Sequence, residues 1–169
     1  ANFDIPISID TYKHAVAKEA IDAGACMVND IWGLKADEQM AALIAEKKIP
    51  CCLMHNRREP DYQNLIPDML KDLRESLDIG EKAGISRDSI ILDPGIGFGK
   101  TYEMNLQAIN QVEALHELRC PILLATSRKS VIGLTLDLPA HQRIEGTAAT
   151  TVIGVMKGCS FVRVHDVKE

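Results

Sequence analysis

One repeating pattern limits the fold of this chain more than any other feature. Short apolar runs end in polar or charged residues, and stretches with helical spacing of apolar residues follow them. The runs are rich in Ile, Val, Leu and Cys with little alternation, which is typical of parallel strands buried on both faces. The predicted strands are residues 5–9, 26–28, 51–54, 90–92, 122–125 and 161–164, and the predicted helices are 12–23, 37–47, 65–83, 102–118 and 147–157. The sequence therefore predicts one α/β domain over residues 1–169.

Two α/β architectures fit this order, an open doubly wound sheet and a (β/α)8 barrel. Ligands of an open sheet gather at one switch point, whereas here every run ends in polar residues, as expected where all strand ends converge on the mouth of a barrel. A complete barrel takes about 250 residues, and this chain has 169. No helix follows the last run. We therefore expect an incomplete TIM barrel that contains strands 3 to 8.

The composition excludes several classes of protein. The formal net charge is −5, with 46% hydrophobic and 25% charged residues, the profile of an ordinary globular chain. Apolar runs such as residues 122–125 are far shorter than the ~20 residues of a membrane span. The negative charge argues against general binding to nucleic acid or to anionic membranes. Five cysteines without C-x-x-C spacing indicate reduced core residues, and hence a cytoplasmic protein.

The segment after the fourth run, residues 92–101, reads LDPGIGFGKT. It fails the P-loop pattern because Pro94 occupies the place of the first glycine, and its G-x-G-x-G spacing is not the dinucleotide fingerprint. A flexible loop is one interpretation. The other is that the glycines let the backbone approach a flat ligand, with Asp93 and Phe98 beside it.

Two later segments place cations at strand ends. Residues 126–130 have the sequence TSRKS. One interpretation is a solvated turn. The other is a site where Arg128 and Lys129 bind an anion or heteroatom, beside a short helix that begins at Ser130. In the last run, alternation points Arg163 and His165 the same way. An arginine facing a barrel interior needs an anionic partner, and its planar donors match phosphate.

Two early strand ends carry Asp10 and Asn29. Singly, each fits a helix cap or a turn. Together with Asp93, they would place three hydrogen-bonding side chains at one mouth, which suits the donors and acceptors of a heteroaromatic ring. No zinc-binding spacing and no G-x-S-x-G elbow occurs. The role of His55, at the end of the third run, stays open.

Taken in order, these segments resemble the motifs of dihydropteroate synthase, a pterin-binding TIM barrel of folate biosynthesis. The last three motifs together are highly specific, whereas the first two alone would indicate only a pterin-binding barrel. The motifs read ISIDT (7–11), VNDI (28–31), CLMH (52–55), LDPGIGFGK (92–100), SRKS (127–130) and RVHDV (163–167).

The resemblance implies an activity and a role for each motif residue. The family joins 7,8-dihydropterin-6-ylmethyl diphosphate to p-aminobenzoate, with help from Mg²⁺, and releases 7,8-dihydropteroate and diphosphate; sulfonamides compete with p-aminobenzoate. The expected catalytic residues are Lys129, Arg163 and His165. The pterin is expected at Asp10, Asn29, Asp93 and Lys129, the diphosphate at Arg163 and His165, and p-aminobenzoate at Phe98 and Ser130.

The resemblance begins at what would be the third barrel strand. Three parts of the family have no counterpart in residues 1–169: the loop with the main Mg²⁺ ligand, the Gly-Gly-Glu-Ser-Thr loop and the last helix. No residue of this chain is expected to ligate a metal. We therefore expect little activity from residues 1–169 alone, and a homo-oligomer formed through the open strand edges at residues 5–9 and 161–164. Two alternatives remain: a pterin-binding methyltransferase that handles methyltetrahydrofolate, and a non-catalytic pterin-binding fragment.

Overall fold

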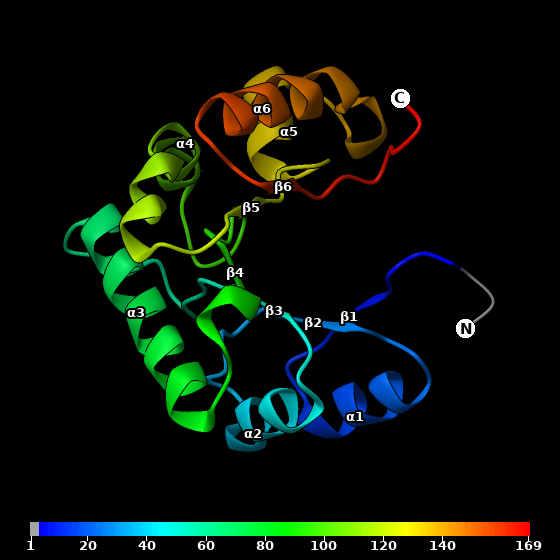
Figure 1. The fold of residues 1–169 in the computed structure, drawn as a ribbon. Coiled ribbons are helices and arrows are strands. Elements are labelled where there is room, and N and C mark those ends of the chain that lie inside the picture. Colours follow the sequence, from blue (N-terminus) through cyan, green and yellow to red (C-terminus); the bar gives the residue numbers. More distant parts are fainter. Residues whose placement is uncertain (1–3) are drawn as a thin grey trace.

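A computed structural model describes residues 4–169 of the chain. Within these residues, parallel strands alternate with helices (Figure 1). The strands are β1 (Ser8–Asp10), β2 (Met27–Asp30), β3 (Cys51–Met54), β4 (Ile90–Asp93), β5 (Leu123–Leu124) and β6 (Phe161–Val162). The α-helices are α1 (His14–Asp22), α2 (Glu38–Lys47), α3 (Leu65–Ala83), α4 (Tyr102–Asn110), α5 (Ser130–Leu136) and α6 (Ile144–Met156), and the 3-10 helices are η1 (Arg87–Ser89), η2 (Val112–Leu118) and η3 (Ala140–Gln142).

The strands follow one another in chain order around an arc. β1 to β4 form a four-stranded parallel sheet, and β5 pairs with β6. A parallel bridge between Leu92 and Ile122 joins the two sheets. The helices lie outside the arc, which is open between β1 and β6 (Figure 1). This arrangement confirms the predicted incomplete barrel, and its carboxyl-end mouth is where the predicted site residues should meet.

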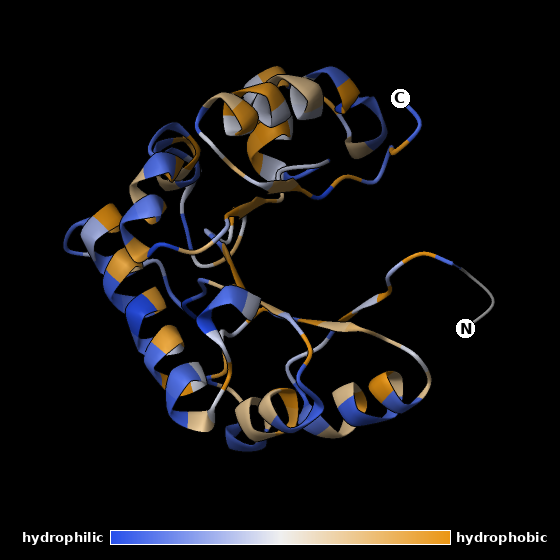
Figure 2. Ribbon diagram, in the orientation of Figure 1, coloured by the Kyte–Doolittle hydropathy of each residue, from blue (hydrophilic) through white to orange (hydrophobic). Residues whose placement is uncertain are grey.

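The core fills the space between the strands and the outer helices. One cluster of buried apolar side chains includes Met40 of α2, Met69 and Leu73 of α3, and Leu53 and Leu92 of the strands, all with no exposed surface. Figure 2 shows the apolar inner strands and the mixed colouring of the helices around them. Burying each such side chain contributes about 1.5–3 kcal/mol, so this cluster fixes the strands whose ends carry the site.

The structure corrects several bounds of the sequence-based prediction. β1 covers Ser8–Asp10 rather than residues 5–9, and β6 covers Phe161–Val162 rather than residues 161–164. The helix expected over 102–118 ends at Asn110 and continues as the 3-10 helix η2. A 3-10 helix has three residues per turn, so it places Val112, Leu115 and Leu118 on one buried face. The long connection over 127–145 contains α5 and η3, and α6 begins at Ile144 rather than at residue 147.

The cysteine prediction is partly wrong. All five cysteines are free thiols, and Cys51, Cys52 and Cys120 are buried, as expected. Cys26 is exposed instead, because it lies just before β2, next to the outermost strand, and its thiol reaches only the Ile7 carbonyl at 3.5 Å.

The outer strands are poorly covered. In the part of the chain that the structure describes, β1 pairs only with β2, and β6 only with β5. Ile5 is 68% exposed, and Phe161 and Val162 of β6 are 46% and 41% exposed. These values agree with the predicted open edges. No helix within residues 4–169 combines the length and the apolar character that crossing a membrane requires.

Candidate active site

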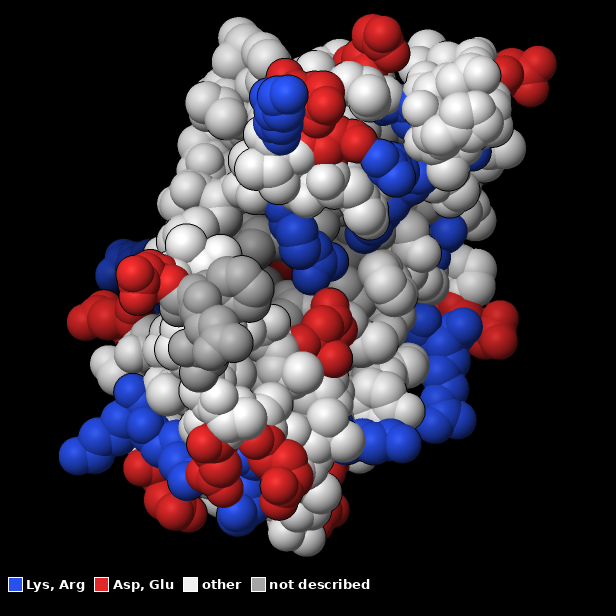
Figure 3. Space-filling view, turned by 90° about the vertical axis from the view of Figure 1, so that its right-hand side faces the viewer, with Lys and Arg blue, Asp and Glu red and all other residues white. Residues whose placement is uncertain are grey.

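A cavity of about 400 Å³ brings together residues from opposite ends of the chain. It contains five of the predicted site residues, and Ser127 adds a hydroxyl group. The lining residues are Asp10, Phe98, Ala125, Ser127, Lys129, Arg163, Val164 and His165. Figure 3 looks onto the open side of the arc, where basic and acidic side chains lie close together near the middle of the face.

Asn29 and Asp10 connect the first two strand ends. The parallel register sets Asp10 beside Asn29, and Asn29 Nδ2 donates to Asp10 Oδ2 at 3.0 Å. Asn29 is buried, whereas the Asp10 side chain is largely exposed toward the opening. The pair thus presents an amide and a carboxylate side by side, as expected from their positions at neighbouring strand ends.

Asp93 is the most unusual group of the site. It is fully buried at the end of β4, and its Oδ1 accepts a hydrogen bond of 2.7 Å from the Gly95 amide. None of residues 4–169 gives Asp93 Oδ2 a hydrogen-bond partner. Burial raises the pKa of Asp93, while Lys129, the Gly95 amide and Arg163 oppose that shift. A buried carboxylate oxygen without a partner is costly unless a ligand donates to it.

Lys129 lies between Asp93 and the glycine loop. Its ammonium group donates to the Ile96 carbonyl and lies 4.9 Å from the centre of the Phe98 ring. Burial lowers the pKa of Lys129 to about 8, although Asp93 pulls it upward. Lys129 is therefore a cation at neutral pH that is held by the same loop that carries Phe98.

His165 is oriented by Ser127. The His165 amide donates to Ser127 Oγ at 3.1 Å, and His165 Nδ1 lies 2.9 Å from the same oxygen. The Ser127 hydroxyl can donate to Nδ1 or accept from it, and in either case it holds the ring in place. Nε2 is then the ring nitrogen left for a ligand. Arg163, from the same segment, lies 3.4 Å from Asp10, so the cavity holds two side chains suited to an anion.

Arg128 and Ser130 of the TSRKS segment, which the sequence analysis considered for binding, do not line the cavity. Arg128 makes a two-pronged ion pair with Asp166, so it does not take the anion-binding role considered from the sequence. Ser130 begins α5, is exposed, and lines a separate hollow with Gly133 and Arg143. The structure thus brings Lys129, but not Ser130, into the cavity.

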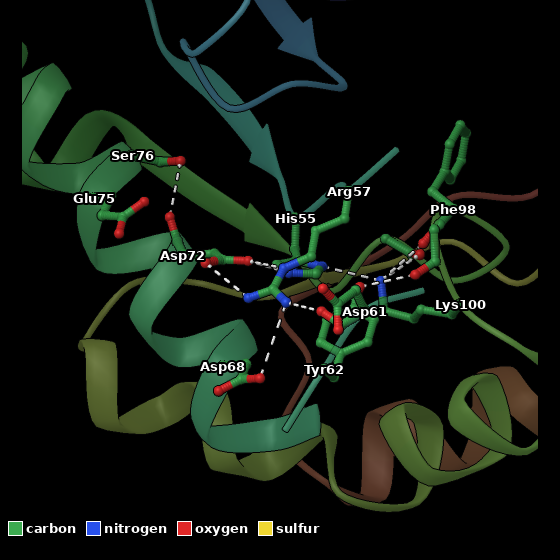
Figure 4. Close-up of polar contacts among 12 residues, drawn as sticks. His55, Arg57, Asp61, Tyr62, Asp68, Asp72, Glu75, Ser76, Phe98 and Lys100 are labelled. Atoms are coloured by element: carbon green, nitrogen blue, oxygen red, sulfur yellow. Dashed lines mark hydrogen bonds and ion pairs between the residues drawn. The ribbon is translucent and has the colours of Figure 1, made fainter. Parts of the chain in front are cut away.

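A polar cluster behind the glycine loop escaped the sequence analysis, which left only the role of His55 open. His55 is buried, and its Nε2 lies 3.0 Å from Asp72 of α3 and its Nδ1 3.0 Å from the Lys100 ammonium group. Arg57 Nε donates to the same Asp72 oxygen at 2.6 Å. Figure 4 shows His55 between Asp72 and Lys100. The only sequence signal was a histidine at a strand end, because its partners lie 17 and 45 residues away.

Burial and hydrogen bonds shift the pKa values of three groups in this cluster. Burial lowers the pKa of His55 to about 4, so the ring is neutral at pH 7. Burial alone would raise the pKa of Asp72, but hydrogen bonds from His55 and Arg57 outweigh it and hold that pKa below its ordinary value. Burial lowers the pKa of Lys100 to about 7.

The described residues do not form a metal centre of their own. Among residues 4–169, no three His, Cys, Asp or Glu side chains gather in a way that could hold a metal ion. Mg²⁺ needs no such cluster, because it is commonly held by one or two carboxylates together with substrate phosphates.

Two curated proteins that are similar to this chain are both named dihydropteroate synthase. Dihydropteroate synthase of Clostridium beijerinckii is 62% identical over 169 residues, which are 99% of this chain and 63% of that protein. The Bacillus subtilis dihydropteroate synthase is 56% identical over 165 residues, 98% of this chain and 58% of that protein. The chain thus spans about three fifths of the length of these curated relatives.

Solved structures agree with the fold. Dihydropteroate synthase from Clostridium difficile, determined in the presence of pteroic acid, superposes with a TM-score of 0.95 and 46% identity over 98% of this chain and 63% of that one. The Xanthomonas albilineans enzyme with 4-aminobenzoic acid gives 0.92 and 35% identity over 96% of this chain and 60% of that one. The family model for pterin-binding enzymes matches residues 1–165. This chain belongs to the family of pterin-binding enzymes.

Proposed function

We propose that this chain carries the pterin- and diphosphate-binding part of a dihydropteroate synthase, which condenses 7,8-dihydropterin-6-ylmethyl diphosphate with p-aminobenzoate. The observation that carries the proposal is the buried Asp93 oxygen that has no partner among residues 4–169. The amino-pyrimidinone edge of a pterin offers N–H donors that would satisfy it. Relatives at 62% and 56% identity bear the name of this enzyme, which supports the choice.

The pterin would lie across the strand ends with its donor edge on Asp93. The nearby Asn29 amide and Lys129 ammonium group supply donors to ring heteroatoms, and Asp10 supplies an acceptor. The glycine loop provides the backbone surface beside the ring. Each charged hydrogen bond of this kind contributes about 1.5–3 kcal/mol, so Asp93 should dominate pterin affinity.

The diphosphate would lie near Arg163 and His165, at the opening between β6 and β1. In the reaction, the bond between the methylene carbon and the diphosphate oxygen breaks, and the arylamine nitrogen forms the new bond to that carbon. The diphosphate leaves with the electron pair, and the amine loses a proton. Arg163 and the His165 Nε2–H would stabilise the growing negative charge on the leaving oxygens.

The p-aminobenzoate would bind beside Phe98, which lines the cavity. Ser130 lies at the start of α5, on a separate hollow, so we propose that it meets only the far, carboxylate end of this substrate. The same proposal includes competition between sulfonamides and p-aminobenzoate for the position beside Phe98. Mg²⁺ enters it as a component of the whole enzyme, and we assign no step to it here.

Calorimetric titration of residues 1–169 with 6-hydroxymethylpterin, diphosphate and p-aminobenzoate, each alone, tests this assignment. The proposal predicts saturable binding of the pterin and weaker, salt-sensitive binding of diphosphate. A fourth titration uses methyltetrahydrofolate. Binding of this ligand without any response to diphosphate would favour a methyltransferase instead. A chain that is folded by circular dichroism and binds none of the first three ligands would refute the proposal.

A further inference from the structure

The loop between β4 and α4 is held by several side chains. Asn105 Oδ1 accepts from the Gly97 amide at 2.6 Å, the Tyr62 hydroxyl donates to the Gly99 carbonyl at 2.9 Å, and Lys100 makes three contacts. Lys100 Nζ lies 3.0 Å from the Gly95 carbonyl, 3.1 Å from the Phe98 carbonyl and 3.0 Å from His55 Nδ1. An ammonium group has three N–H donors and no acceptor. Lys100 can donate to all three of these groups. On the other side of the ring the ionised Asp72 only accepts, so His55 Nε2 carries the proton and Nδ1 is the acceptor.

This assignment places the three groups in one chain of hydrogen bonds. Nδ1 of neutral His55 accepts from Lys100, and Nε2 donates to Asp72 at 3.0 Å. Asp72 belongs to α3, one of the helices around the core. Lys100 thus links the loop, through His55, to a rigid helix, and Figure 4 shows its dashed contacts running to both sides.

Ile96 anchors the loop in the core with a fully buried side chain, and three glycines shape the backbone around it. Gly95, Gly97 and Gly99 all have positive φ, at 69°, 84° and 53°. A Cβ at Gly95 would lie 1.9 Å from the His55 carbonyl oxygen, and one at Gly99 would lie 2.2 Å from that of Arg57. The loop backbone therefore packs closely against the 55–57 segment, which only glycine permits, and Lys100 supplies two of the hydrogen bonds that hold it there.

Three side chains of the candidate site depend on this loop. The Gly95 amide donates to Asp93, the Ile96 carbonyl accepts from Lys129, and Phe98 lines the cavity. Lys100 does not line that cavity. We propose that Lys100 is a positioning residue that, through the Gly95–Gly99 backbone, sets the places of Asp93, Lys129 and Phe98 for ligand binding; this inference rests on the proposed function of the same site.

The electrostatic surroundings support a positioning role. The groups that act on Lys100 are His55 after β3, Arg57 in the following loop, Asp72 of α3, Asp93 of β4 and Lys129 before α5. Burial and the cations lower the pKa of Lys100 to about 7, whereas Asp93 and Asp72 raise it. A half-buried lysine whose ammonium group contacts two main-chain carbonyls, away from the cavity, is suited to holding main chain rather than to reacting.

The test compares Lys100→Met with Lys35→Met. Lys35 also donates to α3, at the Asp72 carbonyl and at Glu75, but it does not touch the loop. We expect Lys100→Met to weaken 6-hydroxymethylpterin binding at least tenfold and to speed hydrogen exchange of residues 95–99 at least tenfold, with unchanged exchange in β2 and α2. Lys35→Met should leave both quantities within twofold of the parent.

The exchange measurement needs no ligand, so it separates this inference from the proposed function. A parent chain that binds no pterin would refute the proposed function, while faster loop exchange in Lys100→Met would still support the loop-holding role. Lys100→Gln, which keeps a donor near the loop, should show the same effects at three- to tenfold. Unchanged loop exchange and affinity, or variants that both unfold the whole chain instead of loosening the loop, would show that the positioning role is wrong.

Discussion

Arg163 Nη1 lies 3.4 Å from Asp10 Oδ2, although 153 residues separate them in the sequence. This contact spans the opening between the last and first strands, and both side chains line the cavity. Asp10 also accepts from Asn29, which holds the carboxylate in place. The arginine is therefore kept over the cavity by a carboxylate that an incoming anion must compete with.

Replacing Asp10 should change the affinities for diphosphate and for pterin in opposite directions. In Asp10→Asn, Arg163 loses its competing carboxylate, and an exposed ion pair of this kind is worth about 0.2–1 kcal/mol. Diphosphate affinity should therefore rise about two- to fivefold at low salt, while pterin affinity falls. Calorimetry with each ligand gives both numbers. A parallel loss of both affinities would show that Asp10 acts only on the fold.

Removing the arginine itself should weaken anion binding. Arg163→Met is expected to lower diphosphate affinity about tenfold or more, because a charged hydrogen bond contributes about 1.5–3 kcal/mol. The matched control is Arg74→Met, since Arg74 pairs with Glu117 on the outer surface. Equal diphosphate binding by the two variants would contradict the assignment of the anion subsite.

The buried histidine should make stability depend on pH. The folded-state pKa of His55 is about 4, below its ordinary value of 6.5, because burial disfavours the charged ring. The unfolded chain therefore binds the extra proton first, so this group costs stability as pH falls from about 6.5 to about 4. Asp93, whose pKa is raised, acts in the opposite sense.

A variant isolates the histidine contribution. Urea unfolding at pH 7, 6 and 5 should show a shallower loss of stability in His55→Gln than in the parent. Glutamine does not titrate, its amide can still donate to Asp72, and Asp72 is ionised throughout this pH range. A parent and variant with parallel pH curves would show that His55 is not held neutral in the fold.

The strand ends could be predicted because each depends on a local pattern. An apolar run followed by a polar residue locates Asp10, Asn29, Asp93 and Arg163, and parallel strands then bring those residues to one mouth. The Arg128–Asp166 pair could not be predicted, since nothing in the local sequence says which of two adjacent cations turns toward the cavity. Motif resemblance likewise does not show that Ser130 lies outside it.

The polar cluster behind the glycine loop could not be predicted from local sequence patterns, for a different reason. His55, Asp72 and Lys100 come from a strand end, the middle of a helix and a loop, and only the packing of α3 against the strands brings them together. The break between α4 and η2 has a similar origin, because burial of every third residue, rather than helix propensity, decides it.

Residues 1–169 alone should make little or no 7,8-dihydropteroate. These residues span 63% of the length of the Clostridium beijerinckii relative, and losing precise positioning of reacting groups costs orders of magnitude in rate. The assay measures product from dihydropterin diphosphate and p-aminobenzoate with Mg²⁺ present. A rate close to that of the Bacillus subtilis relative would show that these residues suffice for catalysis.

The exposed strand edges should drive self-association. Ile5, Phe161 and Val162 are exposed on or beside strands that lack an outer neighbour within residues 4–169. Unprotected apolar edges recruit further strands. Light scattering coupled to size exclusion, over a concentration series, should therefore show a discrete oligomer or aggregation. A stable monomer at all concentrations would contradict this expectation.

Pterin titration of Asp93→Asn tests the central claim most directly. The matched control is Asp30→Asn, since Asp30 is also buried at a strand end, but both its oxygens accept amides, from Trp32 and Leu34. The account predicts that Asp93→Asn lowers the affinity for 6-hydroxymethylpterin about ten- to a hundredfold, while the folded fraction of Asp30→Asn binds like the parent. Parent-like pterin affinity in a folded Asp93→Asn chain would contradict the account.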